Sequence, residues 1–152
     1  MKNIFKMAIN IKNYTTEVAA SKSIEAIERL LVEFGATNIM KEYGPGGRVI
    51  QISFIIVVEN MRLPFRLPAK VKEVYVWLKK KFPQRKDATL LEQAERVVWK
   101  QLWDWVHITL SGIQLEQLET LEALFPYLYE IEKNQTYYQR IKQTKFKALL
   151  PG

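Results

Sequence analysis

The sequence predicts a single α+β domain over residues 1–152, in which a small, mostly antiparallel sheet of three or four strands packs against helices. Residues 36–67 alternate between apolar and polar side chains, which is typical of strands. From residue 68 onward the apolar residues recur every three or four positions, which predicts a helical C-terminal half. The chain contains no repeat or linker and is long enough to bury a core without metal ions or disulfides.

The N-terminal region predicts one strand followed by one helix. Apolar side chains alternate along residues 5–12, which favours a strand. Residues 1–6 are a possible dispensable extension, because Met7 could equally begin the chain. We expect Ser21 to cap a helix that buries Ile24, Ile27 and Leu31 and ends at Gly35.

Three further strands are predicted over residues 36–43, 48–58 and 61–67. The glycine-rich residues 44–47 join the first two as a turn, since they lack the Lys-Ser/Thr of a phosphate-binding loop. Pro64 cannot donate a backbone hydrogen bond, so the last strand should lie at an edge. Arg62 and Arg66 share a sheet face that is either a binding surface or a guard of that edge strand.

The helical half predicts a central helix over residues 89–113. Its broad apolar arc, with Trp99 and Trp103 on one shoulder, implies contacts on more than one side. A helix over residues 68–82 precedes it, and another over 115–125 follows and breaks at Pro126. Residues 134–152 form a basic, aromatic tail with Thr136 as a possible helix cap.

Charge is segregated along this chain of net charge +7. Residues 67–86 carry seven Lys/Arg against one Asp/Glu, and residues 133–152 carry five against none. Residues 87–132 reverse this balance, with two Lys/Arg against nine Asp/Glu. Such segregation favours a polyanionic partner, self-association of unlike patches or internal neutralisation.

The composition offers little for catalysis. The chain has no cysteine and one histidine, which excludes thiol chemistry and zinc–thiolate sites. His107 lies one helical turn from Asp104 and from Ser111, and three side chains on one straight helix cannot converge on a substrate atom. Glu42 and Glu59 are the only candidates for a two-metal site. We therefore expect a non-enzymatic protein without metal or cofactor.

Basic and aromatic residues predict nucleic-acid binding instead. Phosphate contacts are assigned to Arg62, Arg66, Lys79, Lys80, Lys81, Arg85 and Lys86. Arg140 and Lys142 are further nucleic-acid-binding candidates, beside two tyrosines of the tail. Trp77, Tyr137 and Tyr138 could stack on unpaired bases, which favours single strands. The ordinary alternative is that the lysines are solvated and the tyrosines belong to the core or to an interface.

Several motifs resemble a family of small, uncharacterised proteins encoded in phages and prophages of Gram-positive bacteria. These motifs are Asn13-Tyr14-Thr15-Thr16, KSIEAIERLLVEFGA, Phe65-Arg66-Leu67-Pro68, QAERVVWKQLWDWV at 93–106 and Leu150-Pro151-Gly152. The resemblance covers most of the chain from Met7 onward. It implies a genomic setting, with roles in replication, recombination or counter-defence in the host bacterial cytoplasm, and carries over no catalytic residue.

A second function class remains open alongside nucleic-acid binding. As a counter-defence protein, the chain would block a host defence protein or sequester a nucleotide signal, and its unlike charge blocks would favour a homo-oligomer. Trp99 and Trp103 make a protein interface credible. Without a long apolar run or a signal peptide, the sequence predicts a cytoplasmic protein with no membrane contact.

Overall fold

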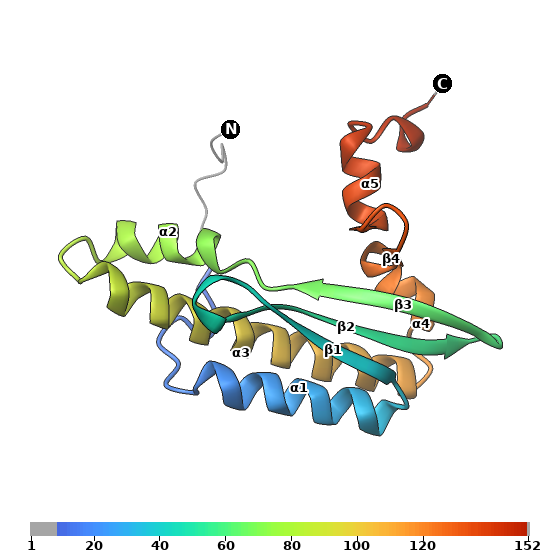
Figure 1. Cartoon of the computed structure of the whole chain (residues 1–152), viewed down its shortest axis with the longest axis horizontal. Coiled ribbons are helices and arrows are strands. Elements are labelled where there is room, and N and C mark those ends of the chain that lie inside the picture. Colours follow the sequence, from blue (N-terminus) through green and yellow to red (C-terminus); the bar gives the residue numbers. More distant parts are fainter. Residues whose placement is uncertain (1–8, 152) are drawn as a thin grey trace.

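The computed structural model describes residues 9–151 and confirms the predicted α+β class (Figure 1). Its helices are α1 (Ala20–Phe34), α2 (Val71–Lys81), α3 (Asp87–Gln114), α4 (Thr120–Leu124) and α5 (Tyr137–Gln143). The main strands are β1 (Thr37–Tyr43), β2 (Val49–Val58) and β3 (Met61–Pro68), and β4 (Tyr129–Glu130) and β5 (Gln135–Thr136) form a small hairpin. Short 3₁₀ turns occupy Pro45–Gly47, Phe125–Tyr127 and Lys147–Leu149.

The main sheet is an antiparallel meander in the order β1-β2-β3. Gly46 and Gly47 adopt positive φ in the turn between β1 and β2, as predicted for this glycine cluster. Phe54 of β2 lies opposite Phe65 of β3. Strand β3 is an edge strand, as Pro64 indicated, although Phe65 also forms a single bridge to Leu128.

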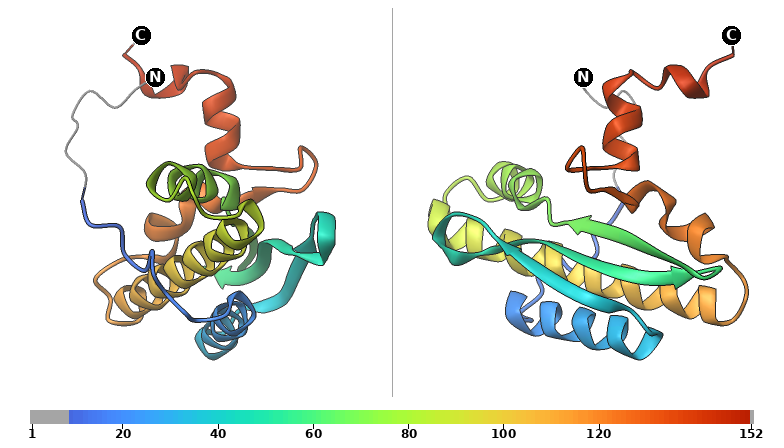
Figure 2. Two further views of the ribbon diagram at one scale, coloured as in Figure 1. Left: turned by 90° about the vertical axis from the view of Figure 1, so that its left-hand side faces the viewer. Right: turned by 45° about the vertical axis from the view of Figure 1, so that its right-hand side comes forward.

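One face of the sheet is covered by α1 and α3 (Figures 1 and 2). The core side chains of β2 and β3 pack there with Ile27 and Leu31 of α1 and with Trp99 of α3. A second, smaller core forms where Leu78 of α2 meets Leu90 and Ala94 at the start of α3. The predicted central helix therefore contacts the sheet layer and α2, and it continues past Gly112 to Gln114.

Residues 125–151, here called the C-terminal arm, project from the body of the molecule (Figures 1 and 2). The arm begins beside β3, where Leu128 forms a single β-bridge with Phe65. The Leu128 carbonyl also accepts a hydrogen bond from the Tyr137 amide at 2.7 Å. Thr136 caps α5, as predicted, because its hydroxyl accepts from the Gln139 amide while the Gln139 side chain accepts from the Thr136 amide.

Three local predictions differ from the structure, and one element of the structure was not predicted. Helix α1 begins at Ala20 with Ala19 at the N-cap, so Ser21 lies in the first turn and is not the cap. The helix expected over residues 115–125 shrinks to α4, because residues 115–119 form turns, with positive φ at Glu116. The β4–β5 hairpin was not predicted. The expected strand over residues 5–12 lies partly outside the described residues, and residues 9–12 form no strand.

Candidate nucleic-acid interface

A groove of about 760 Å³ lies between α2, α3 and the C-terminal arm. Its floor is apolar and includes Leu67 of β3, Val74 of α2 and Val98 of α3. Trp105 and Tyr127 also line it, and they contact each other edge to face with ring centroids 5.4 Å apart. Tyr138 of α5 closes the far side. The groove therefore joins the basic middle of the chain to its basic tail.

Each long wall of the groove carries a lysine. Lys70 precedes α2 and Lys142 lies on α5, and within residues 9–151 neither side chain takes part in an ion pair. Glu73 is the carboxylate among the lining residues. Lysines that face solvent without a carboxylate partner remain available to an external anion. Two walls with such lysines favour a ligand that carries more than one negative charge.

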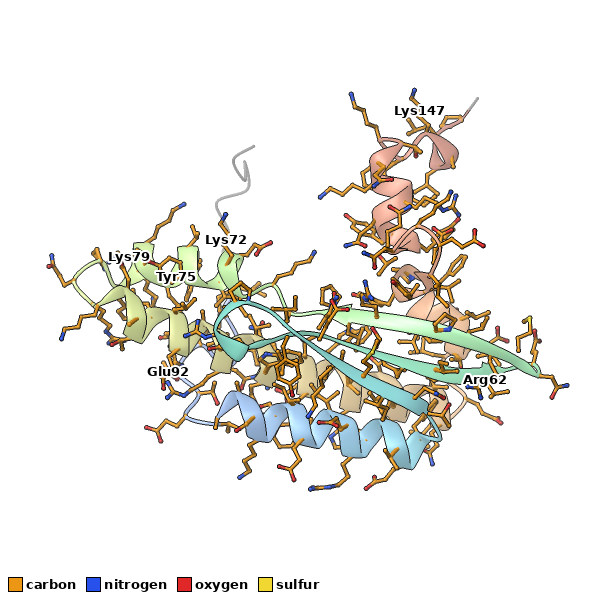
Figure 3. The ribbon with its side chains drawn as sticks, viewed as in Figure 1. Arg62, Lys72, Tyr75, Lys79, Glu92 and Lys147 are labelled. Carbon is orange, nitrogen blue, oxygen red and sulfur yellow. The ribbon has the colours of Figure 1, made fainter. Side chains whose placement is uncertain are left out.

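The exposed face of α2 extends this positive surface away from the groove. Lys72, Val76 and Lys80 are spaced four residues apart, so they lie on one stripe of the helix, and all three are exposed. Figure 3 shows Lys72 near the start of α2 and Lys79 near its end. At the helical rise, Lys70 to Lys81 spans about 16 Å. This length suits a short stretch of an extended polyanion.

The three consecutive lysines at the end of α2 do not share one face. Lys79 pairs with Asp87 at 2.8 Å and donates to the Arg85 carbonyl at 3.2 Å. The hydrogen bond from Lys79, and then that from Tyr75, hold the pKa of Asp87 below its usual value, and the same Lys79–Asp87 bond raises the pKa of Lys79. Lys79 therefore stabilises the junction of α2 and α3, whereas Lys80 faces solvent.

Lys81, Trp77 and Arg85 belong to a small cluster of cations and aromatic rings. The Lys81 Nζ lies 5.6 Å from the centroid of the Trp77 ring and 5.2 Å from that of the Tyr14 ring. Trp77 packs edge to face on Tyr14 at 5.7 Å, and the Arg85 guanidinium lies 3.9 Å from the Phe82 ring centroid. Trp77 is half-buried in these contacts, so less of its ring is left for a base than the sequence suggested.

Arg66 is buried, with 8% of its surface exposed, and its guanidinium is bound within the protein. Its nitrogens lie 3.3 Å from Ser53 Oγ, 3.2 Å from Asn134 Oδ1 and 3.7 Å from Glu42 Oε1. The guanidinium also lies 3.8 Å from the centroid of the Tyr129 ring. Asn134 and Tyr129 belong to the β4–β5 hairpin segment, so Arg66 connects the sheet to the C-terminal arm.

The remaining predicted site residues are dispersed. Arg62 lies at the tip of the β2–β3 hairpin, at the opposite end of the molecule from Lys79, and donates to Asn38 at 3.0 Å (Figure 3). Tyr137 stacks on Phe125 with ring centroids 4.5 Å apart. Arg140 pairs with Glu130 at 2.7 Å. Lys86, in the loop before α3, is exposed. Of the predicted residues, Tyr138 and Lys142 line the groove.

Three of the side chains considered for catalysis, those of Asp104, Ser111 and Glu42, have structural partners. Asp104 accepts from Lys100 at 2.6 Å and from Asn13 at 2.8 Å, and Ser111 donates to the His107 carbonyl at 2.7 Å. Glu42 faces Arg66, as described above. Across residues 9–151, no three His, Cys, Asp or Glu side chains lie close enough together to hold a metal ion. In that same span no helix has the length and apolar content to cross a membrane.

Sequence reasoning missed most of the groove. Trp105, Tyr127 and Lys70 line it, yet each looked like an ordinary core or surface residue in its own segment. The sequence did show that residues 67–86 are basic and that the tail is basic and aromatic. It did not indicate that these two segments lie close together. Comparison of the chain with protein-family models, with curated proteins and with solved structures finds no match.

Proposed function

We propose that this protein binds single-stranded nucleic acid without catalysing a reaction, with the strand entering the groove and continuing along the exposed stripe of α2. The observation that carries this proposal is the groove itself. Two chain segments that are distant in sequence each bring a lysine to it, Lys70 and Lys142, which form no ion pair within residues 9–151, beside the exposed ring of Tyr138. Phosphate contacts supply affinity for any sequence, and base stacking supplies the preference for single strands.

A single strand fits these features better than a duplex. Duplex bases are stacked on one another and expose only their edges, so they cannot use the Tyr138 ring. Outside the groove, Lys72 and Lys80 share one exposed stripe of α2. The resemblance to phage and prophage proteins adds a setting in which a single-strand binder would act, namely replication or recombination in the host cytoplasm.

The test is a titration of labelled single-stranded and double-stranded oligonucleotides, followed by fluorescence anisotropy at two salt concentrations. We expect tighter binding of the single strand and a steep loss of affinity as salt rises. The variant Lys72→Gln/Lys80→Gln should lower the salt slope by about 1.4, since each phosphate contact to a single strand contributes about 0.7.

The matched control is Lys22→Gln/Arg29→Gln, which removes the same charge from α1. Both control residues are exposed, and Arg29 makes only a surface pair with Glu25 at 3.6 Å. An equal loss of affinity in both double variants would show that net charge alone drives binding. No binding at low salt would refute the proposal.

A second candidate function, an interaction protein that acts as a homo-oligomer or blocks a host defence protein, is favoured by the open face of the sheet. Met40 and Val57 lie on the face turned away from α1 and α3, and each is more than half exposed. Exposed apolar patches of this kind often mark protein interfaces. Sedimentation velocity of the protein and of Val57→Lys tests it: a wild-type dimer that the variant dissociates supports this function, and a monomer in both removes the homo-oligomer.

A further inference from the structure

The groove has the size and surface of a pocket for one organic ring system. Its volume of about 760 Å³ falls within the range of about 300–1,000 Å³ that small-molecule sites occupy. The floor includes Leu67, Val74 and Val98, and the lining has more apolar than polar surface. Its charged and polar members are Lys70, Glu73, Gln101, Thr136, Gln139 and Lys142. Phosphate contacts alone require no such floor, because they form on exposed helix faces. The floor therefore calls for a ligand part that is flat and apolar.

Aromatic rings supply the surface for such a part. Trp105 and Tyr127 are half-buried, contact each other edge to face and both line the groove. Trp105 also lines a second hollow beside residues 9–12, so only part of its open surface faces the groove. Tyr138 of α5 also lines the groove, and 43% of its surface is exposed. Rings held in this way present stacking surfaces without the entropic cost of ordering flexible side chains.

Two glutamine side chains in the groove offer complementary polar atoms. The Gln101 amide nitrogen donates to the Lys12 carbonyl at 2.8 Å, which leaves its Oε1 free of protein donors within the described residues. The Gln139 Oε1 accepts from the Thr136 amide at 2.8 Å, which leaves its amide nitrogen as a donor. One acceptor and one donor, each oriented by a backbone bond, match the mixed edges of nucleobases.

From these features we propose that the groove is a base-binding subsite, which holds one unstacked base of the strand while Lys70 and Lys142 contact the flanking phosphates. This inference rests on the proposed function and adds where the base lies. The charge fits, since Lys70 and Lys142 both line the groove and would lie close to the phosphates that flank a bound base. The stripe on α2 then holds the adjoining backbone, and the groove supplies the part of the affinity that depends on bases.

The test compares an oligonucleotide that carries bases with one of equal length built entirely of abasic residues, which keeps every phosphate. We expect the abasic strand to bind about tenfold more weakly, because stacking of one base contributes about 1–3 kcal/mol, with an unchanged salt slope. The variant Tyr138→Ala should lose this discrimination. The control Tyr43→Ala removes an equally large, exposed tyrosine from β1 and should keep it.

The outcomes separate this inference from the proposed function. If both strands bind equally and with the same salt slope, the base subsite is refuted while single-strand binding stands. If neither strand binds, both proposals fail. A third measurement, equilibrium dialysis with adenosine monophosphate, distinguishes a free nucleotide from a strand. If the mononucleotide binds as tightly as the oligonucleotide, the groove is a base pocket but the proposal that it binds a strand is refuted.

Discussion

Replacement of Arg66 by methionine should destabilise the protein and loosen the C-terminal arm. Methionine keeps most of the apolar length of the side chain but removes its charge and donors. The guanidinium bonds to Ser53 and Asn134 are long, at 3.3 and 3.2 Å, so each contributes about 1 kcal/mol. Its contact with the Tyr129 ring adds about 1 kcal/mol.

The lost ion pair with Glu42 adds little, because nearly half of the Glu42 side chain is exposed and water can solvate the carboxylate. We therefore expect a loss of about 2–3 kcal/mol in the free energy of unfolding. Urea unfolding followed by far-ultraviolet circular dichroism measures this loss. Hydrogen exchange shows which part of the molecule is loosened, since the amides of α5 should exchange faster while those of β2 keep their protection.

The control variant is Arg62→Met, which removes an exposed arginine from the same face of the sheet. Its side-chain bond to Asn38 is exposed to solvent, so stability should change by no more than about 0.5 kcal/mol. If Arg66→Met unfolds at the wild-type urea concentration, or if exchange in α5 does not change, Arg66 does not hold the arm.

Three further predictions concern the body of the fold. Burial raises the pKa of Asp104, but the hydrogen bonds from Lys100 and Asn13 outweigh it and hold that pKa below its usual 3.8. The unfolded state thus binds the proton more readily, so the Asp104 carboxylate stabilises the fold fully above about pH 4, and this stabilisation is lost as the pH falls through the folded-state pKa. The variant Asp104→Asn should therefore lower the free energy of unfolding by about 1–2 kcal/mol at neutral pH and leave it unchanged in strong acid. Urea unfolding at both pH values measures this difference. Gly35→Ala should lower the free energy of unfolding by about 1–2 kcal/mol, because Gly35 ends α1 at φ 104°, in the left-handed region that alanine disfavours. An unchanged melting temperature would contradict this. Ser23→Ala should stabilise the protein by about 1 kcal/mol, since the buried Oγ of Ser23 has no hydrogen-bond partner within the described residues. A clearly lower melting temperature of the variant in calorimetry would show that the hydroxyl does form a stabilising hydrogen bond.

The sequence predicted the elements whose periodicity reflects burial along the element itself. The alternation in β2 and the broad arc of α3 follow from burial on known faces, and both segments form as expected. The capping pair of Thr136 and Gln139 is also a local pattern. Such features depend on residues that are close together in the sequence, so they can be predicted from the sequence alone.

Features that depend on distant contacts could not be predicted in this way. Arg66 alternates along β3 like any outward-facing residue, but the β4–β5 hairpin folds over it and buries it. That hairpin has strands of two residues, too short for any periodic signal. The groove has the same origin, because Lys70 and Lys142 are distant in the sequence and meet only through tertiary packing.

The most direct test of nucleic-acid binding in the groove is photochemical crosslinking of a short single strand that contains 4-thiothymidine, with the crosslinked residues mapped by mass spectrometry. Crosslinks should concentrate on Tyr138, Trp105 and Tyr127, the aromatic side chains that line the groove. A smaller set is expected along α2. Crosslinks confined to the β2–β3 hairpin tip around Arg62, or no crosslinks at low salt, would contradict the account.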